Sequence, residues 1–224
     1  MVLVLLLLAG LAGLGGGSTA LYLELTRAPT RAEVAAAGEA EIASRWQRLP
    51  AGQIFPATIR YLTSAGLHAT AVRTGISPRA SCRAALDAAV ATVFRRAGCV
   101  TVLRATYVDR QGLLAATVGV AVMRDAPAAG RAAPTSPPVR TGVRVARFPG
   151  SWAGLFRNAQ RGWFMTTGSS GRYVFLVAAG YLDGRPGHAD YAAGPESLGS
   201  GVLNHVVTVL TTGGKPCARK AVRC

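Results

Sequence analysis

Four cysteines are the residues of this chain whose type and spacing point most directly to a chemistry. Cys82 and Cys99 lie at the two ends of a predicted helix, and Cys217 and Cys224 lie seven residues apart near the end of the chain. An even number of cysteines in an extracellular context is typical of paired disulfides. We therefore expect two disulfides and an oxidising compartment.

The pairing of these cysteines depends on whether the helix is continuous. Seventeen residues of unbroken helix would separate Cys82 from Cys99 by roughly 25 Å, whereas bridged Cα atoms lie about 4.4–6.8 Å apart. An extended tail spans roughly 23 Å between Cys217 and Cys224, so the pattern favours a tail that is bonded to both ends of the helix. Two local disulfides are the alternative, and they require the helix to break. A zinc site is a third interpretation, but neither pair has the C-x2–4-C spacing of a zinc knuckle, so no metal is expected.

Candidate catalytic residues are few. Asp183, His188 and Asp190 fall in one predicted turn, where a histidine between carboxylates is suited to binding a metal or relaying a proton. Aspartate and glycine are also common in turns for backbone reasons alone. His68 and His205 fall in a predicted strand and a predicted helix, where we expect them at the edge of the core. No nucleophile or phosphate-loop motif is present in the sequence, so we expect no catalytic residue and no cofactor.

Charge provides the strongest candidate for a binding site. The chain has 25 Lys and Arg residues against 10 Asp and Glu, a formal net charge of +15, and no acidic residue lies between 126 and 182. Arginines alternate there with aromatic residues, and the candidate binding residues are Arg140, Arg144, Arg147, Trp152, Arg157, Arg161 and Trp163. Such a surface suits anionic lipid, a cell-wall polyanion or an acidic protein partner. The other interpretation places the aromatic residues in the core and the arginines on a solvated face of an arginine-rich protein.

The N-terminal residues 1–25 are apolar, with no charge before Glu24. About 20 apolar residues suffice to cross a bilayer, so the segment predicts a transmembrane anchor. A cleaved signal peptide is the alternative, with residues 2–8 as its apolar core and 18–20 as the cleavage site. We expect a helical stalk over 26–50, a single-pass protein of the cell membrane, and an extracytoplasmic domain over 51–224. Nucleic acid is not an expected partner, because a disulfide-bearing domain outside the membrane rarely meets it.

Hydrophobic periodicity predicts the elements of the domain. Predicted helices cover 31–49, 77–96 and 195–210, and predicted strands cover 53–63, 67–76, 99–108, 113–123 and 142–148. Residues 162–182 are predicted to form two strands joined by a hairpin turn at GSSG, residues 168–171. Residues 124–141 are rich in Pro, Ala and Gly and are expected to form a mobile surface loop. Hairpins between consecutive strands predict an α+β fold, with an antiparallel sheet and helices packed on one side of it.

Individual residues sharpen these predictions. The strand over 113–123 is apolar on both faces, which is typical of a central strand. Ser77 is expected to cap the second helix and Gly98 to end it. Asp87 is expected to pair with Arg83, one helical turn before it, and Asp109 to stabilise the turn after its strand.

The run "SCRAALDAAVATVFRRAGCVTVLRATYVD" over 81–109, with "RWQRLPAGQIFP" before it, resembles uncharacterised membrane-anchored extracytoplasmic proteins of actinobacteria. More loosely, an anchor followed by a disulfide-bearing α+β domain resembles the extracytoplasmic sensor regions of actinobacterial Ser/Thr kinases. These resemblances imply a topology and no activity. We therefore expect a non-catalytic, membrane-tethered binding, adaptor or sensor module. The alternative is a secreted enzyme with its site around Asp183, His188 and Asp190.

Overall fold

The computed structural model describes residues 22, 27–133, 141–185 and 193–213. They belong to two compact units, one of residues 1–41 and 215–224 and the other of residues 42–214. Apart from Tyr22, the predicted anchor 1–25 lies outside the described residues. Among the residues that are described, no helix is both long and apolar enough to cross a membrane.

The first unit contains the start of helix α2 (Arg31–Arg48). The Thr30 hydroxyl accepts a hydrogen bond from the Glu33 amide, and the Glu33 carboxylate accepts one from the Thr30 amide at 2.7 Å. This reciprocal capping box fixes where the helix begins. Hydrogen bonds from Arg27 and then from Thr30 lower the pKa of Glu33 to about 2. The predicted helix over 31–49 is thereby confirmed to within one residue.

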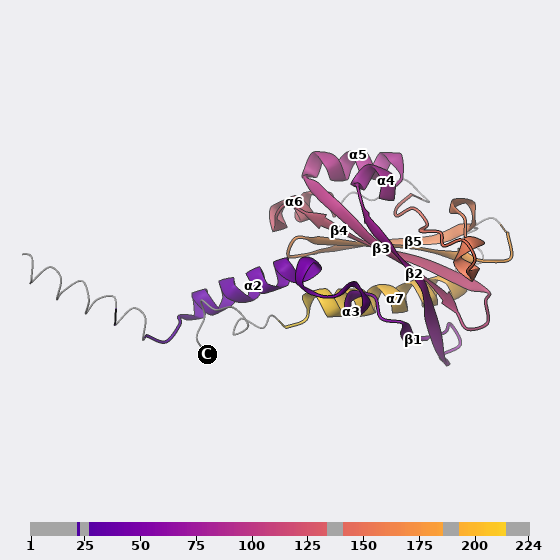
Figure 1. Cartoon of the computed structure of the whole chain (residues 1–224), viewed down its shortest axis with the longest axis horizontal. Helices are drawn as coiled ribbons and strands as arrows, with labels where there is room; N and C mark the ends of the chain where they lie inside the picture. The colour runs from indigo at the N-terminus through magenta and orange to yellow at the C-terminus, as the bar shows by residue number, and fades with distance from the viewer. Residues whose placement is uncertain (1–21, 23–26, 134–140, 186–192, 214–224) are drawn as a thin grey trace, which may run out of the picture. The chain divides into compact units, whose positions relative to one another are not determined.

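The second unit is built on a six-stranded antiparallel sheet with the strand order β1-β2-β3-β4-β6-β5. Figure 1 shows these strands crossing the unit between helical layers. The strands are β1 (Thr58–Leu62), β2 (His68–Ala80), β3 (Cys99–Asp109), β4 (Leu114–Met123), β5 (Arg161–Ser170) and β6 (Tyr173–Tyr181). Three hairpins connect β1 to β2, β3 to β4, and β5 to β6, which confirms the predicted antiparallel sheet.

Helix α7 (Ala193–Thr211) covers one face of the sheet, together with the short helix α3 (Ala51–Ile54). Its buried residues recur at helical spacing: Leu198, Val202, Leu203, Val206 and Leu210. Two glycines let the helix approach the strands closely. A Cβ on Gly199 would lie 2.4 Å from the Trp163 ring, and one on Gly201 would lie 2.4 Å from the Tyr61 Cβ.

The opposite face carries the helices α4 (Cys82–Ala85), α5 (Ala88–Ala97) and α6 (Ala126–Ala132). The predicted α+β class is therefore confirmed, with an antiparallel sheet and, as expected, helices packed on one side of it, here α7 and α3. The second helical layer was not predicted. The expected loop over 124–141 is wrong for its first part, because α6 occupies it: Asp125 caps the helix by accepting a hydrogen bond from the Ala128 amide at 2.6 Å. Residues 134–140 lie outside the described part of the chain.

The end of α2 is held within the second unit by Arg45 and Trp46. The Arg45 guanidinium donates hydrogen bonds to the carbonyls of Val209 and Thr212 in the last turn of α7, at 2.9 and 3.1 Å. Cations at this position satisfy carbonyls that have no partner within the helix. Trp46 is buried, and its backbone amide donates to the Tyr173 hydroxyl at the start of β6. The chain therefore enters this unit beside the beginning of β6.

The predicted helix over 77–96 differs most from the structure. Strand β2 continues to Ala80, and Ser81, not Ser77, caps α4 by accepting a hydrogen bond from the Ala84 amide. Leu86 and Asp87 are extended, which separates α4 from α5. Gly98 ends α5 at a φ of 102°, as predicted.

This break decides the disulfide. Cys82 and Cys99 are bonded to each other, with their Cα atoms 6.4 Å apart. The predicted bonds from these two residues to the tail are therefore wrong, and the local alternative is confirmed for this pair. The prediction failed because it assumed a continuous helix. Cys217 and Cys224 lie outside the described residues.

Candidate binding surface

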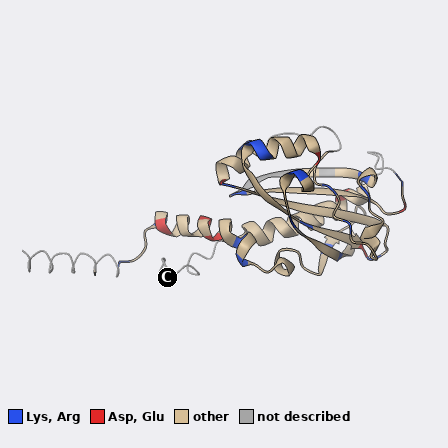
Figure 2. Cartoon of the chain, turned by 45° about the horizontal axis from the view of Figure 1, so that its top comes forward, with Lys and Arg blue, Asp and Glu red and all other residues tan. Residues whose placement is uncertain are grey.

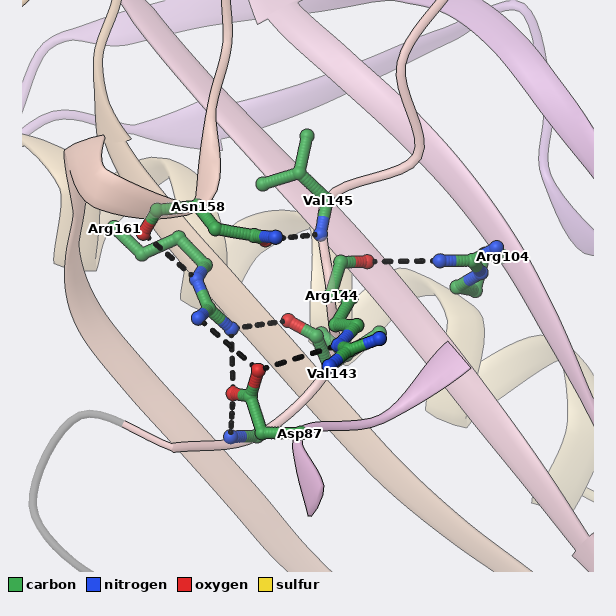
Figure 3. A network of polar contacts seen from close by, with 8 residues as sticks. Asp87, Arg104, Val143, Arg144, Val145, Asn158 and Arg161 are labelled. Atoms are coloured by element: carbon green, nitrogen blue, oxygen red, sulfur yellow. Dashed lines mark hydrogen bonds and ion pairs between the residues drawn. The ribbon is translucent and has the colours of Figure 1, made fainter. Parts of the chain in front are cut away.

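Asp87 lies at the break between α4 and α5, where it anchors the loop over 141–147 (Figure 3). Its carboxylate accepts hydrogen bonds from the Arg161 guanidinium, with 2.8 Å from Nη1 to Oδ2, and from the Gly142 amide at 2.9 Å. Arg161 also donates to the Val143 carbonyl at 2.9 Å and to the Asn158 carbonyl at 3.0 Å. One buried guanidinium thus connects α5, the loop and β5.

Arg144 and Asn158 extend this network (Figure 3). The Arg144 Nε lies 3.6 Å from the Asp87 Oδ1, and its carbonyl accepts a hydrogen bond from Arg104 at 3.1 Å. The Asn158 side chain accepts one from the Val145 amide at 3.0 Å. Burial, and then the nearby charge of Arg144, lower the pKa of Arg104. Most of the polar contacts in this network hold the loop, through Gly142, Val143, Arg144 and Val145, so the network has a structural role.

The loop lies directly on the sheet because the strands below it carry small residues. A Cβ on Gly119 would lie 2.8 Å from Val143, and one on Gly75 would lie 2.5 Å from the Phe148 ring. Thr106 donates to the Ala146 carbonyl at 2.7 Å between these two contacts. The predicted strand over 142–148 is wrong: the segment is an extended loop, with one isolated bridge from Leu86 to Val143.

Past Phe148 the chain forms an open cleft with a volume of about 610 Å³. It is lined by Arg147, Pro149, Gly150, Ser151, Trp152, Gly154, Leu155 and Arg157. A short 3-10 helix, η1 (Trp152–Gly154), shapes the cleft, and the Ser151 hydroxyl fixes its start by donating to the Phe148 carbonyl at 2.7 Å.

Three large apolar side chains are exposed at this end of the unit. Trp152 is 62% exposed, Leu155 53% and Leu113 57%. The Trp152 ring packs over Gly112 in the β3–β4 turn, since a Cβ on Gly112 would lie 3.1 Å from the ring. Leu113 is the next residue after Gly112 in the sequence. We name these three residues the apolar patch. Scattered exposed leucines are common on protein surfaces, but an exposed tryptophan and an exposed leucine that line the same cleft are typical of a contact site.

Arginines border the apolar patch. Arg147 donates to the Gly154 carbonyl at 3.1 Å, and Arg157 is exposed. In the part of the chain that the structure describes, neither guanidinium pairs with a carboxylate. The acid nearest in sequence to the patch, Asp109, is buried and accepts hydrogen bonds from the amides of Leu113 and Leu114 at 2.8 Å each, as expected for its turn. Figure 2 shows that acidic segments are few and that basic ones are spread over several elements.

The seven candidate residues therefore have three different placements. Arg147, Trp152 and Arg157 line the cleft, whereas Arg144 and Arg161 turn to Asp87. Trp163 packs against Gly199 of α7, on the core side of the sheet. Arg140 lies outside the described residues.

Sequence reasoning missed Leu113, Leu155 and the role of Asp87. Asp87 does not pair with Arg83 as expected, because it lies outside both helices and points towards β5. Asp87 is the only acidic residue between Glu41 and Asp109, which is the sequence signal that would have indicated a distant arginine as its partner. The exposure of Leu113 depends on the turn, for which the sequence carries no such signal.

The alternative catalytic site is described only in part. Asp183 is exposed and pairs with Arg185, whose hydrogen bonds lower the pKa of its carboxyl group. His188 and Asp190 lie outside the described residues. His68 and His205 line a second cleft, between β1 and α7. Within 27–133, 141–185 and 193–213, no three His, Cys, Asp or Glu side chains converge as a metal site would require.

The surface thus combines two arginines with an apolar patch. Ser151 is the one hydroxyl side chain among the described residues that line the cleft, and no described histidine or carboxylate lines it. Its chemistry is suited to binding an anion that also has an apolar face. Comparison of the chain with models of protein families, with curated proteins and with solved structures found no match.

Proposed function

We propose that this chain is a non-catalytic, membrane-tethered extracytoplasmic binding module, and that its ligand is an acidic polysaccharide of the cell envelope. One observation carries the proposal: Trp152 and Leu155 are exposed between Arg147 and Arg157, and no described carboxylate neutralises either arginine. The surface has the charge and the apolar area that such a polymer requires.

Each part of the surface matches a part of that ligand. Guanidinium groups form paired hydrogen bonds with carboxylates and phosphates, which suits Arg147 and Arg157. An exposed tryptophan offers a flat apolar face with little conformational freedom to lose, which suits the ring of a sugar. Because the Asp87 network holds the loop on the sheet, these side chains are presented from an ordered base.

Within the second unit, the surface and residues 42–46 lie at opposite ends of strand β6. Residues 42–46 contact Tyr173 at the start of β6, whereas Leu113 accepts a hydrogen bond from the Leu182 amide just past its end. Strand β6 therefore separates the entry of the chain from the surface by roughly 25 Å.

Binding of polygalacturonate to the full chain in detergent tests the proposal, with neutral dextran of matched length as the control polymer. We expect binding to polygalacturonate only, weakened by about tenfold or more in the double variant Arg147→Ala/Arg157→Ala, since hydrogen bonds to charged groups contribute about 1.5–3 kcal/mol each. Trp152→Ala is expected to weaken it by about fivefold. The matched control is Arg95→Ala/Arg96→Ala, which removes two exposed arginines of α5.

Equal losses in the two double variants would show that only net charge matters and would overturn the proposal. Quenching of Trp152 by brominated anionic lipid, in the chain reconstituted into vesicles, would assign the surface to the bilayer instead. The variant Trp152→Phe distinguishes that signal from the signals of Trp46 and Trp163, which are both packed into the core.

A further inference from the structure

A second cleft lies at the other edge of the sheet, along β1. Its volume is about 520 Å³, and it is lined by Arg60, Tyr61, Leu62, His68, Gly201, Asn204, His205 and Thr208. Three of these lining residues, Arg60 to Leu62, are consecutive in β1. Because successive side chains of a strand point to opposite faces, the cleft runs along the edge of β1 and not over one of its faces.

The outer edge of β1 has unpaired backbone groups. Strand β2 is its neighbour on one side, and among the described residues no strand lies on the other. Arg73 donates to the Ala57 carbonyl, and Thr63 donates to the Leu67 carbonyl, each at 2.8 Å. Since pairing in an antiparallel ladder alternates, residues 57, 59, 61 and 63 face β2. The amides and carbonyls of Thr58, Arg60 and Leu62 therefore face outward.

Helix α7 forms the other wall of the cleft. Gly201 lets the helix approach β1 so closely that a Cβ at this position would meet Tyr61. Asn204 and Thr208 follow at positions one helical turn apart, both exposed, so they lie on the same face of α7. A strand placed beside β1 would thus have hydrogen-bonding groups on one side and polar side chains of a helix on the other.

We propose that an extended, acidic peptide of a partner protein adds to β1 as a further strand and lies in the cleft between β1 and α7. An exposed edge strand is a template for pairing with another chain. The charge selects the kind of peptide: Arg60 lines the cleft, and no described acidic residue does. The ligand gains backbone hydrogen bonds from the outward groups of β1 and an ion pair with Arg60.

A second copy of this chain is a less suitable occupant. Symmetric pairing of two β1 strands about their centre places Arg60 opposite Arg60, and like charges directly opposite each other destabilise a sheet. The net charge of +15 on each chain adds to this repulsion. The edge is therefore suited to a partner of opposite charge.

The test uses a pool of synthetic decapeptides in which Glu or Asp alternates with Val, Ile or Thr, and a matched pool with Lys in place of the acids. In the full chain in detergent, amide hydrogen exchange is followed by NMR. We expect the amides of Thr58, Arg60 and Leu62 to exchange faster than those of Ile59 and Tyr61, and to become protected when the acidic pool is added.

Methylation of peptide nitrogens separates backbone pairing from charge. In the acidic peptide that binds most tightly, every second backbone amide would donate to β1. Methylating this set of amides is expected to weaken binding by about tenfold or more. Methylating the other set, which faces away from β1, is expected to change binding little. Arg60→Glu is expected to abolish the preference for acidic over Lys-containing peptides. The control Arg95→Glu inverts an equally exposed charge on α5, on the opposite face of the sheet, and should leave the preference intact.

The proposal is wrong if no acidic peptide protects these amides at millimolar concentration, or if both methylation patterns weaken binding equally. If these amides are protected from exchange without any peptide, and more so at higher protein concentration, the edge pairs with a second copy of the chain. That result would also overturn the proposal. Binding of polygalacturonate is measured separately, so the outcome here is independent of the ligand proposed above.

Discussion

Arg161 and Asp87 are 74 residues apart in the sequence, and the Nη1 and Oδ2 atoms of their side chains lie 2.8 Å apart in the structure. Both side chains are largely buried, at 8% and 17% exposed. The pair joins the break between α4 and α5 to the first residue of β5, and the loop that leads to the apolar patch passes between them. The exposed surface therefore depends on an interior contact.

Replacing Asp87 tests that dependence. Asp87→Asn leaves the Arg161 guanidinium buried without its counter-charge, so we expect the free energy of unfolding to fall by about 3 kcal/mol. Urea denaturation measures this change. Asp183→Asn is the matched control, since Asp183 also pairs with an arginine but is fully exposed, and its unfolding midpoint should not change. Similar midpoints for the two variants would contradict the structural role of Asp87.

Two tryptophans of the acid-free segment are expected to respond differently to truncation. Trp163 packs against Gly199 and the core, so Trp163→Ala should lower the free energy of unfolding by about 3 kcal/mol. Trp152 is 62% exposed, so Trp152→Ala should change stability by less than about 0.5 kcal/mol while it weakens ligand binding. Thermal unfolding of both variants measures the contrast. A large loss of stability in Trp152→Ala would mean that the side chain supports the fold.

The disulfide is expected to stabilise the second unit. Cys82 and Cys99 close a loop with a sequence separation of 17 residues, for which the chain-entropy model gives about 3 kcal/mol. The double variant Cys82→Ser/Cys99→Ser should lower the urea midpoint accordingly, and reductant should then have no further effect through this bond. Hydrogen exchange should increase most in α4 and α5, which lie between the two cysteines. Uniform acceleration that includes α7 would show that the bond acts on the whole unit.

Gly180 has no room for a side chain. A Cβ at this position would lie 1.9 Å from the Gln160 carbonyl oxygen, a backbone atom that cannot move without shifting the start of β5. Gly180→Ala is therefore expected to destabilise the protein by about 3 kcal/mol. Gly130 in α6 has no atom within 4 Å of such a position, so Gly130→Ala should stabilise the protein by about 0.5–1 kcal/mol. Calorimetry measures the thermal unfolding midpoint of each variant. A shift of both midpoints in the same direction would contradict the prediction.

His205 predicts part of the pH dependence of stability. Burial lowers the pKa of its imidazole in the folded protein, so the unfolded chain binds a proton more readily. The stability due to the neutral side chain is present above its unfolded pKa, about 6.5, and is lost as the pH falls through the folded value. The ratio of stability at pH 7.5 to that at pH 5.5 should therefore be smaller in His205→Gln. An unchanged ratio would show that burial does not disfavour its charged form.

Much of the fold was predictable from local patterns. The periodicity of β4 identified a strand that is buried on both faces. In the predicted helix over 195–210, the apolar residues at helical spacing are buried, namely Leu198, Val202, Leu203, Val206 and Leu210. Gly98 ends α5 in the left-handed conformation, as a glycine after a helix suggests. These features depend on residues close together in the sequence, which is why the sequence alone determined the α+β class and its hairpins.

The helix break, the disulfide pairing and the exposure of each tryptophan were decided only by the tertiary structure, because they depend on contacts between residues far apart in the sequence. The break at Leu86 and Asp87 arises because Asp87 reaches Arg161 and the Gly142 amide, and no local pattern distinguishes that choice from a continuous helix. The disulfide partner of Cys82 follows from the same break. Likewise, Trp152 is exposed and Trp163 is partly buried against the core because η1 lies over a turn whereas β5 lies under α7. Residue types predicted a basic, aromatic surface; packing selected which arginines and which tryptophan form it.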